Sequence, residues 1–70
     1  MPFSKGDLIV LTRVVEGQPI GAPGRVIRVN VPWGGLSAAK YTVLLDNGVA
    51  IEGLKEDDLF LDEENGDDDD

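Results

Sequence analysis

The chain contains neither cysteine nor histidine among its 70 residues. Without cysteine it forms no disulfide, no thiolate metal site and no redox pair. Without histidine it also lacks the commonest metal ligand and the side chain that most often transfers protons near neutral pH. Small domains often rely on a disulfide or a metal for stability, so this one has to rely on its apolar core. We therefore expect no metal ion and no other cofactor.

Long apolar segments are missing as well. The longest uninterrupted apolar run, Leu8 to Leu11, is only four residues long, whereas a helix that spans a membrane needs about 20. The first residues contain no apolar segment of the length found in secretion signals. We therefore expect no membrane contact, and a chain without cysteine is compatible with the reducing cytoplasm, which is the location we predict.

The usual arrangements of catalytic groups are absent from the sequence. Nucleophilic catalysis requires an activated hydroxyl, thiol or amine beside a base, and here the base would have to be a carboxylate or a lysine. None of the hydroxyl-bearing residues has such a base at a suggestive spacing. The adjacent acids Asp57 and Asp58 would point to opposite sides of a strand. We expect the protein not to be an enzyme.

Short aliphatic and β-branched segments, separated by glycine and proline, make up the rest of the sequence. Their length and composition are typical of strands. We predict five strands, at residues 7–12, 25–31, 40–45, 49–52 and 59–61. The Asp-Asn-Gly turn at 46–48 joins the third strand to the fourth, because Asn and Gly both accept the positive φ of a tight hairpin. Residues 14–24 and 32–39 are predicted loops.

Five short strands without a helix favour an all-β fold. A strongly bent five-stranded sheet that closes on itself as a small barrel buries one core economically at this size. We assign this barrel to residues 1–61. The predicted core consists of Ile9, Leu11, Val26, Val29, Val43, Leu45, Ile51, Leu54 and Leu59.

Charge divides the chain into two parts. The formal net charge is −8, but residues 1–45 carry five basic and two acidic side chains, a net charge of +3. Residues 46–70 carry one basic and twelve acidic side chains, a net charge of −11. Residues 62–70 include seven acids and nothing apolar, which predicts a disordered acidic tail. Such a tail can aid solubility, compete with an anionic partner for the basic part, or contact a basic partner.

Four segments together resemble the SH3-like small barrels, and among them the KOW-type arrangement. They are Lys5–Leu11, Gly21–Ile27, the hairpin Val43–Gly48 and the closing Glu56–Leu59. The resemblance extends over about residues 5–61 and concerns the fold. It implies a five-stranded SH3-like small barrel, a scaffold used by ribosomal and transcription-factor modules and by accessory subunits of larger complexes.

Trp33 is the first candidate for binding, because it lies between a proline and two glycines in a predicted loop. Tryptophan often anchors binding surfaces, since it supplies a large rigid area at a low cost in entropy. Loops on a rigid scaffold are also where binding residues concentrate. Alternatively, the indole covers an open end of the barrel, and the sequence leaves both interpretations open.

A basic patch is the second candidate. Cations beside exposed aromatic rings would neutralise phosphates and stack on bases. Arg25 and Arg28 are three residues apart in one predicted strand, so they share a face only if a bulge intervenes. The alternative is a solvated strand face with scattered ion pairs. The candidate partner-binding residues are Trp33, Tyr41, Arg13, Arg25, Arg28 and Lys40.

These features predict a non-catalytic protein-binding module that acts as an accessory or regulatory subunit of a larger complex. The alternative is a KOW-like module that binds RNA or DNA through the basic patch, with the acidic tail modulating this binding. The partner and the oligomeric state stay open at this point.

Overall fold

The computed structural model describes residues 3–32 and 39–62, which form five strands and one 3₁₀ turn. The all-β fold is therefore confirmed. Within the described residues, no helix has the length and hydropathy that crossing a membrane requires. The elements are β1 (Leu8–Leu11), β2 (Pro23–Asn30), β3 (Lys40–Leu45), β4 (Ala50–Leu54), the 3₁₀ turn η2 (Glu56–Asp58) and β5 (Leu59–Leu61).

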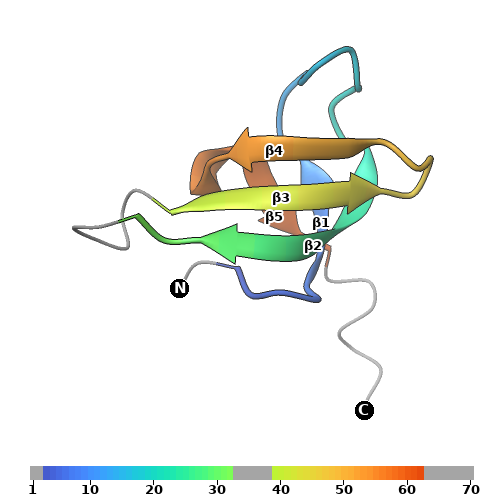
Figure 1. Cartoon of the computed structure of the whole chain (residues 1–70). Helices are drawn as coiled ribbons and strands as arrows, with labels where there is room; N and C mark the ends of the chain where they lie inside the picture. Colours follow the sequence, from blue (N-terminus) through green and yellow to red (C-terminus); the bar gives the residue numbers. More distant parts are fainter. Residues whose placement is uncertain (1–2, 33–38, 63–70) are drawn as a thin grey trace.

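The five strands form one antiparallel sheet in the order β4-β3-β2-β1-β5. In Figure 1, β2, β3 and β4 lie side by side while β1 and β5 cross behind them, so the sheet folds over itself into two layers. The prediction of a sheet closed on itself was wrong, because β4 and β5 do not pair in the described part of the chain. Instead, η2 leads the chain from β4 to the far side of β1, where β5 pairs.

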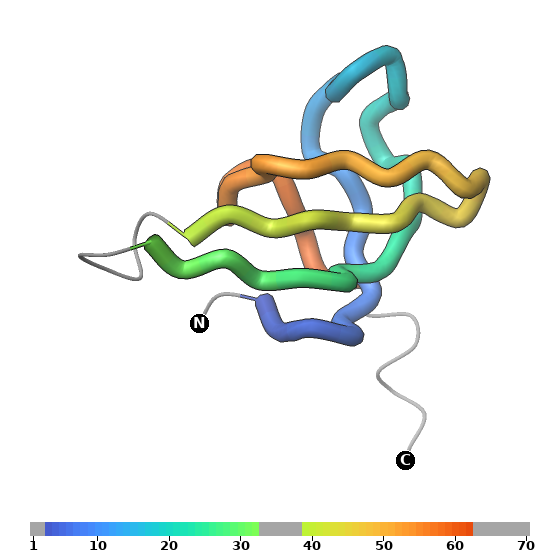
Figure 2. Tube along the Cα trace, viewed as in Figure 1, coloured from blue at the N-terminus to red at the C-terminus, as the bar shows by residue number. Residues whose placement is uncertain are grey.

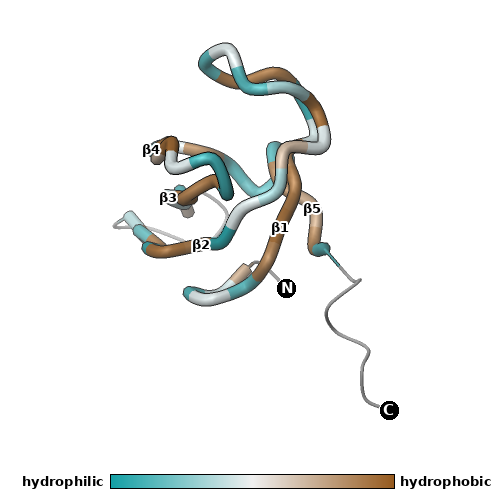
Figure 3. Tube along the Cα trace, turned by 90° about the vertical axis from the view of Figure 1, so that its right-hand side faces the viewer, coloured by the Kyte–Doolittle hydropathy of each residue, from teal (hydrophilic) through white to brown (hydrophobic). Residues whose placement is uncertain are grey.

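The apolar core fills the space between these layers. Every predicted core residue is buried except Val29, which is half-buried and packs against the margin of the cluster. Figure 3 shows the hydrophobic character of β1, whose Ile9 and Leu11 contribute to this core. Ala39 and Tyr41 are also buried there, although they were not among the predicted core residues.

A β-bulge interrupts the pairing of β2 with β3. Val26 lies opposite Val43 and Arg28 lies opposite Thr42, so β2 carries Ile27 as an extra residue between these two pairs. An extra residue in one strand bends that strand and changes which side chains share a face. This is the bulge that Arg25 and Arg28 need in order to project from the same side of the sheet.

The hairpin between β3 and β4 differs in detail from the prediction. Leu45 N–H donates to Val49 O at 2.8 Å, and Gly48 N–H donates to Leu45 O at 2.9 Å. Of the three turn residues, Gly48 alone has a positive φ, 93°. The connection is therefore a three-residue loop with glycine in the left-handed region, rather than a turn that needs positive φ at Asn47 as well.

The predicted loop over residues 14–24 contains a tight turn and ends earlier than expected, because β2 already begins at Pro23. Val15 and Gln18 exchange backbone hydrogen bonds of 3.1 and 2.8 Å, and the two residues between them have positive φ. Gln18 Oε1 also accepts a hydrogen bond of 3.0 Å from Asn47 Nδ2. In Figure 2 the loop rises above β4 at the top of the view. The hydrogen bond between Asn47 and Gln18 connects it to the β3–β4 turn.

Tyr41 is buried in the core with only 1% of its surface exposed, and its ring meets Phe3 edge to face at 5.6 Å between centroids. Its hydroxyl is buried and has no hydrogen-bond partner in the described structure. A buried unpaired hydroxyl loses its bonds to water on folding and gains nothing in return.

We therefore expect Tyr41→Phe to raise the free energy of unfolding by about 1 kcal/mol. Urea unfolding followed by the far-ultraviolet signal measures this change. Tyr41→Leu is the control, because it removes the ring as well and is expected to lower the stability through lost packing. A loss of stability in Tyr41→Phe would show that the hydroxyl has a partner.

Candidate functional site

Arg13 differs from the other predicted basic residues because, among the described residues, it forms an ion pair. Its Nε donates to Asp58 Oδ1 at 2.6 Å. This bond links the segment that follows β1 to η2. Thr12 supports the same junction, since its N–H donates to Asp58 O at 3.0 Å and its hydroxyl donates to Asp57 O at 2.8 Å. Arg13 therefore links the end of β1 to η2, and its guanidinium group is engaged by Asp58 within the chain.

Asp58 is the only charged residue in the described structure that is buried, with 7% of its surface exposed. The hydrogen bond from Arg13 lowers the pKa of this carboxyl, although burial opposes the shift by disfavouring the charged form. Its second oxygen accepts the N–H of Lys55 at 3.0 Å. The same ion pair raises the pKa of Arg13. Sequence reasoning missed this residue, and its place next to Asp57 in an acidic segment gave no signal for its role.

Three of the predicted basic residues do lie on one face, which we call the outer face: the side of β2, β3 and β4 that points away from the core. Arg25 pairs with Leu44, Arg28 with Thr42, and Asn30 with Lys40. Leu44, Thr42 and Lys40 alternate along β3 with the core residues of that strand, so they and their β2 partners project outward. The side chains of Arg25, Arg28 and Lys40 are exposed. Among the described residues, these three cations make no ion pair.

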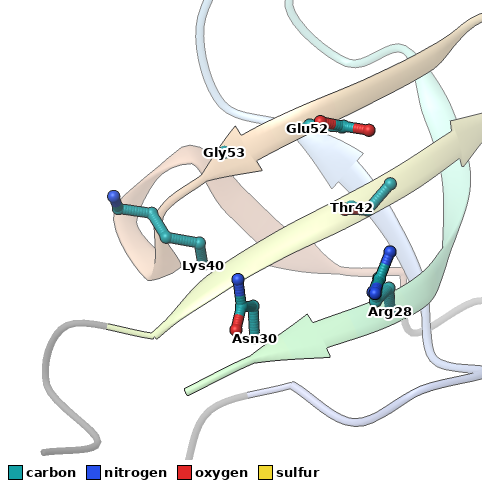
Figure 4. Close-up of a pocket in the computed structure, with 6 residues that line it drawn as sticks. All are labelled: Arg28, Asn30, Lys40, Thr42, Glu52 and Gly53. Atoms are coloured by element: carbon teal, nitrogen blue, oxygen red, sulfur yellow. The ribbon is translucent and has the colours of Figure 1, made fainter. Parts of the chain in front are cut away.

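An open depression of about 510 Å³ lies on the outer face. Figure 4 shows the side chains that border it: Arg28 and Asn30 rise from β2, Lys40 and Thr42 from β3, and Glu52 from β4. Gly53 completes the border, and its φ of 77° accompanies the register shift between β3 and β4. The depression therefore offers two cationic groups, an amide and a hydroxyl next to one carboxylate.

One large apolar side chain lies on the same face. Leu44 pairs with Arg25 and is 42% exposed. Arginine is enriched in protein interfaces, whose rims are polar, so the two arginines of this face are compatible with protein binding. In the described residues, no group of three or more acidic side chains is arranged to hold a metal ion.

The two aromatic candidates have different outcomes. Tyr41 belongs to the core, so its ring is not available to a partner. The sequence held a signal for this, because Tyr41 shares the face of β3 that carries Val43 and Leu45, both predicted to be buried. Trp33 and most of the predicted acidic tail lie outside the described residues.

Comparison of the chain with protein-family models, curated proteins and solved structures finds no match.

Proposed function

We propose that the protein is a non-catalytic protein-binding module, a cytoplasmic accessory or regulatory subunit, that binds its partner through the outer face. Its five-stranded antiparallel sheet is compatible with the resemblance to SH3-like barrels of the KOW type, a scaffold on which binding surfaces are common. The observation that carries the proposal is the alignment of Arg25, Arg28 and Lys40 by the bulge in β2.

The energetics of this face support the proposal. Three exposed cations without an ion pair in the described structure repel one another, and an anionic partner would relieve this repulsion. The exposed side chain of Leu44 adds apolar area that a protein partner would remove from water. Electrostatic complementarity of this kind mainly increases the association rate and the specificity.

Nucleic-acid binding, the alternative, receives less support from the same face. Tyr41, one of the two aromatic residues expected to stack on bases, is buried. Glu52 places a negative charge at the edge of the depression, and the whole chain has a net charge of −8. Both oppose any anionic partner, and they oppose a phosphate backbone most, because it carries a charge at every nucleotide and its binding depends on accumulated positive charge. A protein partner needs to place only a few carboxylates on this face.

The test is capture of partners from cells that contain the protein, with the double variant Arg28→Glu, Lys40→Glu beside the wild type. We expect at least one protein to co-purify with the wild type and to be lost, by about tenfold or more, with the double variant. Lys5→Glu, compared with Arg28→Glu alone, is the charge-matched control, because it reverses one charge in the turn before β1, outside the depression. Trp33→Ala tests the anchor predicted from the sequence in the same experiment.

The circular dichroism spectrum of each variant must match that of the wild type, because the comparison concerns binding and not folding. A partner retained by the folded double variant would contradict the proposal. So would a wild-type protein that captures no protein at all.

A further inference from the structure

We infer that the outer face recognises an extended acidic segment of the partner in which carboxylates occupy every second position. This inference rests on the proposed function and names the chemistry of the partner. It follows from the spacing of the three cations along the strands.

Along the strand direction, the cations are spaced like the alternate side chains of a strand. Arg25 and Arg28 lie on β2 opposite Leu44 and Thr42, and Lys40 lies on the neighbouring strand β3 opposite Asn30. These are three outward-facing pairs between β2 and β3. These pairs are two residues apart on β3, which corresponds to about 7 Å at about 3.4 Å per residue. An extended peptide places its i, i+2 and i+4 side chains on one side at the same interval. Two carboxylates at alternate positions would therefore meet Arg25 and Arg28. A third would meet Lys40, whose long flexible side chain can span the offset of about 5 Å between neighbouring strands.

The bulge is necessary for this match. Without the extra residue Ile27, regular alternation would place Arg25 and Arg28 on opposite sides of β2. The register shift instead brings Arg28 opposite Thr42, in line with Arg25 opposite Leu44. The guanidinium groups then face the same side and can each bind a carboxylate through two parallel hydrogen bonds.

The surroundings of the cations favour carboxylates on one side of the peptide only. Glu52 borders the depression on β4 and would repel acidic side chains placed beyond the row of cations. Thr42 and Asn30 offer a hydroxyl and an amide to the carboxylate bound by Arg28. A segment with alternating acidic and uncharged residues satisfies these conditions better than a continuous acidic run, which would crowd charge on both of its sides.

Two short peptides of identical composition test the inference with the full chain at low salt. Each contains three glutamates among serines and threonines. One has them at every second position and the other has them consecutively. We expect the alternating peptide to bind about five times more tightly and to shift the amide resonances of Arg28, Lys40 and Thr42 in ¹⁵N-labelled protein. Arg28→Gln should weaken this binding by about threefold to fivefold, whereas the control Lys5→Gln should not change it.

Two results would overturn the inference. One is equal affinity for the two peptides. The other is tighter binding of a single-stranded oligonucleotide of equal charge at the same resonances, which would favour nucleic acid as the partner. In either case the proposed function would stand if capture of the cellular protein still depended on Arg28 and Lys40, so the two failures are distinguishable.

Discussion

Replacing Gly24 with alanine is expected to lower the free energy of unfolding by about 2 kcal/mol. A Cβ atom at this position would lie 2.7 Å from Leu44 O and 2.9 Å from Leu45 Cδ2. Gly24 pairs with Ile9 on one side and with Leu45 on the other, so it lies where β2 passes from one layer of the sheet to the next. The carbonyl of Leu44 belongs to the paired backbone of β3 and has little freedom to move. The methyl group would therefore push the strands apart at the centre of the core.

Urea unfolding of Gly24→Ala measures this loss, and Gly24→Val should be more destabilising because it adds two further carbon atoms. Gly17→Asn is the matched control. Gly17 has a φ of 82°, and a Cβ atom added there would have no neighbouring atom within 4 Å. Asn tolerates this backbone region, so we expect a change of less than about 1 kcal/mol. Domains of this size have little stability to lose. A Gly24→Ala protein as stable as the wild type would show that β2 and β3 are further apart than described.

The strands and the core were predictable because local patterns determine them. Aliphatic and β-branched segments alternate between buried and exposed positions, so Ile9 and Leu11 or Val43 and Leu45 could be assigned to the core from their spacing alone. Val29 was the exception. It follows the bulge, pairs with Tyr41 one residue before the end of β2, and is only partly buried against the core cluster.

The candidate site was predictable only in part, because it depends on pairing between distant segments. The sequence indicated that Arg25 and Arg28 could share a face only with a bulge, but nothing local located that bulge at Ile27. The ion pair between Arg13 and Asp58 joins residues 45 positions apart, and no spacing rule predicts it. The sequence predicted a closed barrel, whereas β4 and β5 do not pair in the described structure. The reason is that a short acidic segment does not reveal the path that η2 takes between these strands.

Asp58→Ala is expected to lower the free energy of unfolding by about 2 kcal/mol at neutral pH, since it removes two hydrogen bonds to a buried carboxylate. The substitution eliminates the acceptor for Arg13 Nε at 2.6 Å and for Lys55 N–H at 3.0 Å. The Lys55 N–H begins η2 and would lose its side-chain partner. Arg13→Gln should be milder, because the arginine side chain is 62% exposed and Asp58 would keep its bond to Lys55.

The pH dependence of stability provides an independent test of the same carboxylate. The hydrogen bond from Arg13 lowers the pKa of Asp58 in the folded protein below its ordinary value, and the unfolded chain keeps a value of about 3.9. The unfolded state therefore binds the proton more tightly, so this group stabilises the fold fully above the unfolded pKa. Its contribution decreases as the pH falls below about 4 and is lost once the pH has passed through the folded pKa.

Asp58→Asn isolates this contribution, because it keeps a side-chain oxygen near Lys55 N–H but carries no charge at any pH. Urea midpoints of the wild type and of Asp58→Asn should differ most near pH 7 and should converge as the pH is lowered through the folded pKa of Asp58. The other acids of the chain titrate in both proteins, so their effects cancel in the difference. A difference in stability that stays constant from pH 7 to strongly acidic pH would mean that Asp58 acts through its shape and not through its charge.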